Sequence, residues 1–129
     1  MLQKEGYSIK IVSFGFKYGV PREANFLFDV RFLPNPYFVP ELKELAGTDH
    51  SVKRFVEDSP LTKLFLSSCR SFLEEVLPAY QGSRNGELMV CIGCTGGRHR
   101  SVVIAELLFQ YLKENGGSVT LIHRDIELG

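Results

Sequence analysis

A glycine-rich segment that ends in cations, GCTGGRHRS at positions 93–101, contains the residues of this chain best suited to chemistry. Glycine lets the backbone approach a ligand closely, and N–H groups at the start of a helix attract anions. The hydroxyls of Thr95 and Ser101 and the guanidinium of Arg100 are donors that suit phosphate oxygens. These residue types predict a phosphate-binding loop between a strand and a helix.

Three neighbouring cations, Arg98, His99 and Arg100, stand where a helix is expected to begin, which is an unfavourable place for positive charge. A bound anion removes that cost, so an anion site is favoured over the alternative of a solvated glycine turn. The segment differs from the Walker A pattern G-x-x-x-x-G-K-[ST], because no lysine precedes Ser101. The residues of the segment expected to contact a ligand are Thr95, Gly96, Gly97, Arg98, His99, Arg100 and Ser101.

Cys94 suggests a second interpretation of the same segment, in which it is catalytic. The run from Cys94 to Ser101 has the pattern C-x5-R-S of cysteine-dependent phosphatases, in which a thiolate attacks phosphorus while the loop holds the phosphate oxygens. The nearby cations would favour the thiolate form. Such a reaction also needs a general acid. Asp29 and Asp125 are candidates for that acid, although nothing in the sequence places either beside Cys94.

The elements around this segment predict an α/β fold, with a small, mostly parallel sheet and helices on its faces. Apolar residues at three- and four-residue steps predict helices, and short β-branched runs predict strands. The unit strand 88–92, helix 99–115, strand 118–123 is a βαβ crossover, which implies parallel strands. The remaining expected strands are 8–14 and 26–32, and the remaining expected helices are 51–58 and 61–77.

Two further segments are candidates for a functional role, and one of them is expected beside the glycine-rich loop. Ligands bind beyond the carboxyl ends of parallel strands, so FGFKYG at positions 14–19 should lie beside the loop if their strands are neighbours. Lys17 would then be a second phosphate contact. The proline-rich segment 33–49 contains no long helix or strand and is long enough to be a functional loop or an interface arm.

Composition narrows the classes of protein to which the chain can belong. Its 129 residues suit one domain, and 15 Lys and Arg balance 15 Asp and Glu, so no overall basicity favours nucleic acid. Cys91 and Cys94 form C-x-x-C, but no second ligand pair with zinc spacing exists. No apolar run approaches the roughly 20 residues of a membrane span, and no signal peptide is evident. We expect a cytoplasmic protein without a cofactor, a bound metal or membrane contact.

Four motifs resemble the C-terminal domain of the RNase adapter protein RapZ family. They are SFGFKYGVP at 13–21, FLFDVRFLPNP at 26–36, GCTGGRHRS at 93–101 and HRD at 123–125. The longer strings FDVRFLPNP and IGCTGG-x-HRSV are specific to this family. The resemblance covers nearly the whole chain, roughly positions 13–127, so residues 1–129 are interpreted as a single domain of this type.

The resemblance implies a function in binding and regulation. Such domains sense glucosamine-6-phosphate, bind small regulatory RNA, deliver it to an endoribonuclease and self-associate, while full-length members add an N-terminal P-loop domain. Motif matching assigns sugar-phosphate contacts to Thr95, Gly96, His99 and Arg100, and Tyr18 occupies the place of a ligand-contacting histidine. The family is not known for phosphatase activity, so binding is favoured over catalysis by Cys94.

RNA binding remains open as an alternative to metabolite sensing. Neutralisation of phosphates by Lys and Arg supplies most of the affinity for nucleic acid. Arg98, Arg100 and Arg124 are the residues expected to form a local basic patch for that purpose, with a small RNA and an endoribonuclease as partners.

Overall fold

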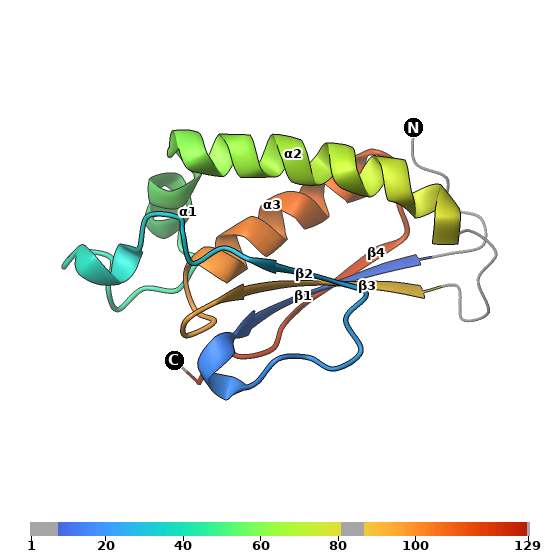
Figure 1. Ribbon diagram of the computed structural model, residues 1–129. Helices are drawn as coiled ribbons and strands as arrows, with labels where there is room; N and C mark the ends of the chain where they lie inside the picture. Colours follow the sequence, from blue (N-terminus) through green and yellow to red (C-terminus); the bar gives the residue numbers. More distant parts are fainter. Residues whose placement is uncertain (1–7, 81–86, 129) are drawn as a thin grey trace.

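A four-stranded, all-parallel sheet forms the centre of the molecule, as seen in a computed structural model that describes residues 8–80 and 87–128 (Figure 1). The strand order is β2-β3-β1-β4. The strands are β1 (Ser8–Gly15), β2 (Phe26–Asp29), β3 (Glu87–Cys94) and β4 (Val119–His123). The α-helices are α1 (His50–Glu57), α2 (Pro60–Val76) and α3 (Arg100–Glu114), and the 3-10 helices are η1 (Phe16–Tyr18), η2 (Pro36–Phe38) and η3 (Leu77–Tyr80). The predicted α/β class with parallel strands is confirmed.

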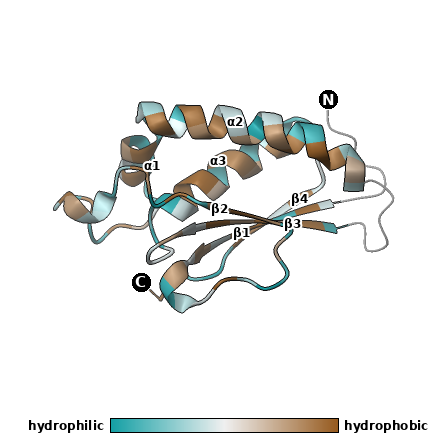
Figure 2. Cartoon of the chain, viewed as in Figure 1, coloured by the Kyte–Doolittle hydropathy of each residue, from teal (hydrophilic) through white to brown (hydrophobic). Residues whose placement is uncertain are grey.

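All three α-helices cover the same side of the sheet, and the opposite side faces the segment that joins β1 to β2 (Figure 1). In Figure 2 the strands are largely hydrophobic, whereas the helices alternate between hydrophobic and hydrophilic residues. Ile9 and Ile11 of β1 belong to the main core under the helices. Val12 and Phe14 of the same strand form a small cluster with Cys91 on the other side of the sheet. Across the described residues, no helix is both long enough and apolar enough to span a bilayer.

Strand β2 is shorter than its sequence suggests, ending at Asp29 instead of continuing to residue 32. The carboxylate of Asp29 accepts hydrogen bonds from the backbone N–H and the guanidinium of Arg31, and Leu33 N–H donates to the carbonyl of Val30. These local bonds turn the chain away from the sheet. Asp29 and Arg31 thus form an exposed ion pair, with 2.7 Å between Oδ2 and Nη2.

The pairing of β1 with β3 brings two loops to one edge of the sheet. Gly15 lies opposite Cys94 in the register, and Lys17 N–H donates to the Thr95 carbonyl at 3.2 Å. A Cβ atom on Gly15 would lie 2.5 Å from the carbonyl carbon of Gly96, so the two loops pack backbone against backbone. The predicted proximity of FGFKYG to the glycine-rich loop is confirmed.

Candidate functional site

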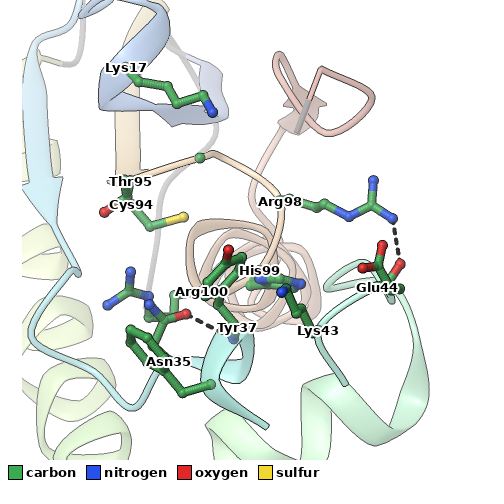
Figure 3. A pocket seen from close by; sticks show the side chains of 12 residues that line it. Lys17, Asn35, Tyr37, Lys43, Glu44, Cys94, Thr95, Arg98, His99 and Arg100 are labelled. Carbon is green, nitrogen blue, oxygen red and sulfur yellow. Dashed lines mark hydrogen bonds between the residues drawn. The ribbon is translucent and has the colours of Figure 1, made fainter. Parts of the chain in front are cut away.

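A cavity of about 650 Å³ opens where β1 and β3 end (Figure 3). Its wall is built by the end of β3 with the loop that leads into α3, by Lys17 after β1, and by an irregular segment after β2. We call residues 35–47, which supply that last part of the wall, the arm. The lining residues are Lys17, Asn35, Tyr37, Phe38, Lys43, Glu44, Cys94, Thr95, Gly96, Arg98, His99 and Arg100.

The backbone N–H groups of the loop between β3 and α3 have no acceptor among the described residues. Within residues 8–80 and 87–128, no protein atom accepts a hydrogen bond from the N–H groups of residues 95–99. The first N–H groups of α3 also lack partners inside the helix, as at every helix start. Gly97 adopts φ +75°, a conformation that bends the loop and that glycine tolerates best. The loop therefore collects free donors at the positive end of a helix, an arrangement that can receive an anion.

Arg100 is buried beneath this loop, with 6% of its surface exposed. Its Nη1 donates to the carbonyls of Arg31 at 2.6 Å and Leu33 at 3.2 Å, which fastens the segment after β2 to the start of α3. Its Nε has no acceptor in the described part of the chain, and an unmet buried donor is costly. Burial lowers the pKa of Arg100, yet a guanidinium stays charged at neutral pH.

His99 connects the loop to the arm. Its Nε2 lies 2.7 Å from the carbonyl of Leu45, and because a carbonyl only accepts, Nε2 carries the hydrogen. Burial is the largest influence on the pKa of His99 and lowers it, against hydrogen bonds to the backbone of Leu45 and Lys43 that raise it. The neutral ring therefore dominates near neutral pH.

Arg98 and Gly47 complete the connection between the loop and the arm. Nη2 of Arg98 donates to the carbonyl of Glu44 at 2.7 Å, and Gly47 N–H donates to the carbonyl of Arg98 at 2.8 Å. A Cβ on Gly47 would lie 2.6 Å from the His99 carbonyl oxygen, so the two segments are in close contact. Arg98 presents charge to the cavity while it holds the arm in place.

Several residues predicted for the site do not line the cavity. Tyr18 donates its hydroxyl to the Leu128 carbonyl at 2.8 Å. Arg124 binds the carboxylate of Asp125 at 2.7 Å and donates to the Gly19 carbonyl at 2.6 Å, so its charge holds the loop after β1. Gly97 and Ser101 are buried behind the cavity wall.

Asp125 anchors the loop after β1 instead of facing the cavity. Its carboxylate accepts a hydrogen bond from Gly15 N–H at 2.8 Å. Burial alone would raise the pKa of Asp125, but the hydrogen bonds from Arg124 and Gly15 outweigh it and hold that pKa below its ordinary value. Since Asp29 is paired with Arg31, both of the acids suggested for Cys94 chemistry are engaged elsewhere.

Cys94 lies in the cavity wall below the loop. It is 2% exposed, and its thiol donates to the Ser101 hydroxyl at 3.1 Å. Cys91 belongs to the cluster on the other side of the sheet, where burial raises its pKa to about 11. No group of three or more His, Cys, Asp or Glu side chains in the described ranges is arranged to hold a metal ion.

The arm supplies lining residues that sequence reasoning did not name. The proline-rich run was recognised as a potential functional loop, but no residue type within it has a diagnostic spacing. The signal that could have found them is the combination of two aromatic residues with a cation and a carboxylate in one irregular segment. These residues are Asn35, Tyr37, Phe38, Lys43 and Glu44.

Comparison with known proteins identifies the family. A sequence profile of the RapZ C-terminal domain matches residues 7–127. A "Nucleotide-binding protein" of Limosilactobacillus reuteri (strain DSM 20016) is 51% identical over 121 residues, which are 94% of this chain and 42% of that protein. Proteins of the same name from Nitratidesulfovibrio vulgaris and Alkaliphilus oremlandii are 50% and 45% identical, over 94% and 98% of this chain and 41% and 43% of their own lengths. The chain spans about two fifths of the length of these relatives. It belongs to the RapZ C-terminal domain family.

Proposed function

We propose that this domain binds a phosphorylated metabolite, an amino-sugar phosphate such as glucosamine-6-phosphate, with the phosphate seated on the loop between β3 and α3. The observation that carries the proposal is the set of N–H groups at residues 95–99, directly before a helix, that have no acceptor in the described part of the chain. A phosphate dianion would accept hydrogen bonds from these groups, and bonds to a charged partner each contribute roughly 1.5–3 kcal/mol. Resemblance to the family supports the choice of ligand.

The charges around the cavity support an anionic ligand. Among the described lining residues, four cations face a single carboxylate: Lys17, Lys43, Arg98 and Arg100 against Glu44. The whole chain is neutral, so this excess is local. A local positive cavity raises the concentration of anions at its mouth and speeds their association.

A substitution at Gly96 tests the proposal without disturbing the fold. A Cβ at this position would contact no atom within 4 Å, so a side chain can be added in open space at the cavity. We expect saturating glucosamine-6-phosphate to raise the melting temperature of the wild type by about 10 °C at a hundredfold excess over Kd. Gly96→Asp, which adds a like charge, should weaken binding more than about tenfold. Gly96→Asn, whose side chain has the shape of the Asp side chain without its charge, is the matched control and should retain most of the binding.

An unchanged melting temperature for the wild type at millimolar ligand would contradict the proposal. So would equal binding by the Asp and Asn variants, because the loop would then not lie near the phosphate. Nucleoside monophosphates should be tested beside glucosamine-6-phosphate, because the relatives are named nucleotide-binding proteins. These relatives also extend well beyond the region that matches this chain.

A second candidate function, hydrolysis of a phosphomonoester, is favoured by the contact between Cys94 and Ser101 below the free N–H groups. Attack of the Cys94 thiolate on phosphorus would form an S–P bond and expel an alcohol, which takes up a proton, before water hydrolyses the cysteinyl phosphate. Turnover of an aryl phosphate that Cys94→Ser abolishes would support this function. Turnover that survives the substitution would remove Cys94 as the nucleophile.

The proposal extends to location and partners on the strength of the family resemblance. We infer a cytoplasmic regulatory domain that self-associates and that can present a small RNA to an endoribonuclease. Because Arg124 and Arg98 donate to protein acceptors, an RNA patch would depend on the rim lysines Lys17 and Lys43 as well. Filter binding at two salt concentrations tests this, since phosphate contacts predict a steep loss of affinity with salt.

A further inference from the structure

We propose that the outward side of α2 is an interface at which two copies of this chain pair their α2 helices in antiparallel orientation, with Ser68 at the crossing point. The inference rests on the self-association proposed above and adds to it a face and an orientation. Its basis is an exposed apolar surface that contributes no residue to the lining of the anion cavity.

Large apolar side chains are exposed together on α2, which runs along the outer margin of the molecule (Figure 1). Leu61, Leu64 and Phe72 are 46%, 63% and 40% exposed, and Phe32 is 52% exposed. Single exposed apolar residues are ordinary, whereas a contiguous group of them marks an interaction surface. The residues that α2 buries in the core lie on another side of the helix: Thr62, Leu66, Cys69 and Leu73.

Ring contacts join the exposed side of α2 to the edge of the sheet. Phe65 of α2 lies edge-on to Phe28 of β2 and to Phe32, with ring centroids 5.8 and 6.1 Å apart. Phe72 contacts Phe26 in the same way at 5.1 Å. Because β2 is an edge strand, the surface continues from the helix to the margin of the sheet. A surface that is already ordered loses little conformational entropy when a partner covers it.

The positions of the exposed residues along α2 are symmetric about Ser68. Leu64 and Phe72 lie four positions on either side of it. Leu61 and Glu75 lie seven positions on either side. Steps of four and seven residues are close to one and two helical turns, so these five side chains form one stripe. A second α2 that runs in the opposite direction places Ser68 against Ser68 and Leu64 against Phe72, and a small residue at the crossing lets the helices approach closely.

The charge along this stripe favours the antiparallel arrangement over the parallel one. Glu75 is the one charged residue of the stripe. In the antiparallel pair it lies beside the partner's Leu61, in the first turn of α2, where the positive end of the helix dipole stabilises a carboxylate. A parallel pair would instead bring two Glu75 carboxylates together. The two-fold axis repeats the favourable contact at both ends, as in other isologous dimers.

Sedimentation equilibrium of the 129-residue chain tests whether this face joins two copies. We expect a monomer–dimer equilibrium with a Kd of about 1–100 µM, because two helix faces and Phe32 make an interface at the small end of the specific range. Leu64→Glu, which sets a carboxylate against the partner's Phe72, should raise Kd more than about tenfold. Ile122→Glu is the matched control: Ile122 is 44% exposed on β4, at the opposite edge of the sheet, and this variant should dimerise as the wild type does.

A thiol at the crossing point tests the orientation. Helix axes about 8–10 Å apart, with Cα atoms about 2.3 Å from each axis, bring the two Cα atoms at the crossing within reach of a disulfide. Ser68→Cys should therefore crosslink two copies under mild oxidation with diamide. Ser67→Cys, which is also exposed but points about 100° away around the helix, is the matched control and should crosslink severalfold less. The native thiols are buried and do not compete: Cys69, Cys91 and Cys94.

A dimer that persists in Leu64→Glu, or one that Ile122→Glu dissociates instead, would overturn this inference while leaving self-association and the phosphate site intact. Equal crosslinking by the two cysteine variants would overturn the antiparallel arrangement. A wild type that stays monomeric at millimolar concentration would overturn the proposed self-association and this inference with it. Melting temperatures measured at a concentration where the wild type is monomeric verify that the variants are folded, since only exposed side chains change.

Discussion

The loop between β3 and α3 and the arm face each other across one cavity, yet they are built in opposite ways. The loop offers backbone N–H groups, and the residues behind it are buried, with His99 8% and Arg100 6% exposed. The arm offers side chains, and Phe38 is 78% exposed. Pre-organised backbone donors hold a charge with little loss of entropy, whereas exposed side chains can change without cost to the core. This contrast is consistent with the proposed function, in which the pre-organised loop is the part that receives the phosphate.

The largest effect is expected from Gly97→Ala, because the loop half of the cavity depends on close backbone packing. Gly97 has φ +75°, and a Cβ there would lie 2.5 Å from the backbone nitrogen of Gly15. We expect the free energy of unfolding to fall by about 2–4 kcal/mol, measured by urea denaturation. Gly96→Ala is the matched control, since its Cβ enters open space. Equal stability of the two variants would show that the loop is not rigidly packed.

Asp125→Asn should have the next largest effect, because it releases the loop after β1, which packs against the loop between β3 and α3. Loss of the charged pair with Arg124 and of a strong acceptor for Gly15 should cost about 2 kcal/mol. The folded-state pKa of Asp125 is lowered, so its contribution is present above the unfolded pKa near 3.9 and is lost as pH falls through the folded value. Urea unfolding from neutral pH down to about pH 3 should show the difference between wild type and variant shrinking. A constant difference would mean that charge is not involved.

His99→Gln should have a smaller, pH-dependent effect at the junction of loop and arm. Burial lowers the pKa of His99, so the unfolded chain takes up a proton more readily, and wild-type stability should fall as pH drops below about 6.5. Glutamine can still donate to the Leu45 carbonyl but does not titrate. The variant should therefore lose less stability than the wild type over this range in thermal unfolding. Parallel curves for the two proteins would contradict the assignment.

The smallest effect on folding is expected from Phe38→Ala in the arm. The side chain is largely exposed, so its removal should change the free energy of unfolding by less than about 0.5 kcal/mol. Affinity for inorganic phosphate should also remain unchanged, because the proposed phosphate site lies on the loop and not on the arm. A loss of stability comparable with that of Gly97→Ala would remove the distinction between a structural loop and a variable arm.

Much of the loop side of the cavity was predictable from the sequence, because residues close together in the chain determine its structure. The run of glycines and cations at 93–101 identified the loop, and the rule for parallel strands brought Lys17 beside it. Cys94 and Asp29 were also recognised as ionisable or nucleophilic groups. Their actual partners, Ser101 and Arg31, follow from spacing along the chain and required little tertiary information.

The arm and the roles of Tyr18 and Arg124 were not predictable in the same way. The arm is irregular backbone held by hydrogen bonds to residues more than 50 positions away, and no periodic pattern encodes such contacts. The segment after β4 folds back on η1. Tyr18 therefore donates to the carbonyl of Leu128, and Arg124 donates to the carbonyl of Gly19. Sequence motifs predicted both residues as site residues, whereas in the structure they bind protein acceptors outside the cavity lining, and those partners depend on the packing of the whole fold.

The most direct test of the central claim is to follow the backbone amide resonances of the loop by two-dimensional NMR during titration with glucosamine-6-phosphate. Amides that donate to phosphate move downfield, so we expect the largest shifts at residues 95–100 and smaller ones in the arm. Inorganic phosphate should reproduce the loop shifts without those of the arm. Shifts confined to other parts of the molecule, or none at saturating ligand, would contradict the account.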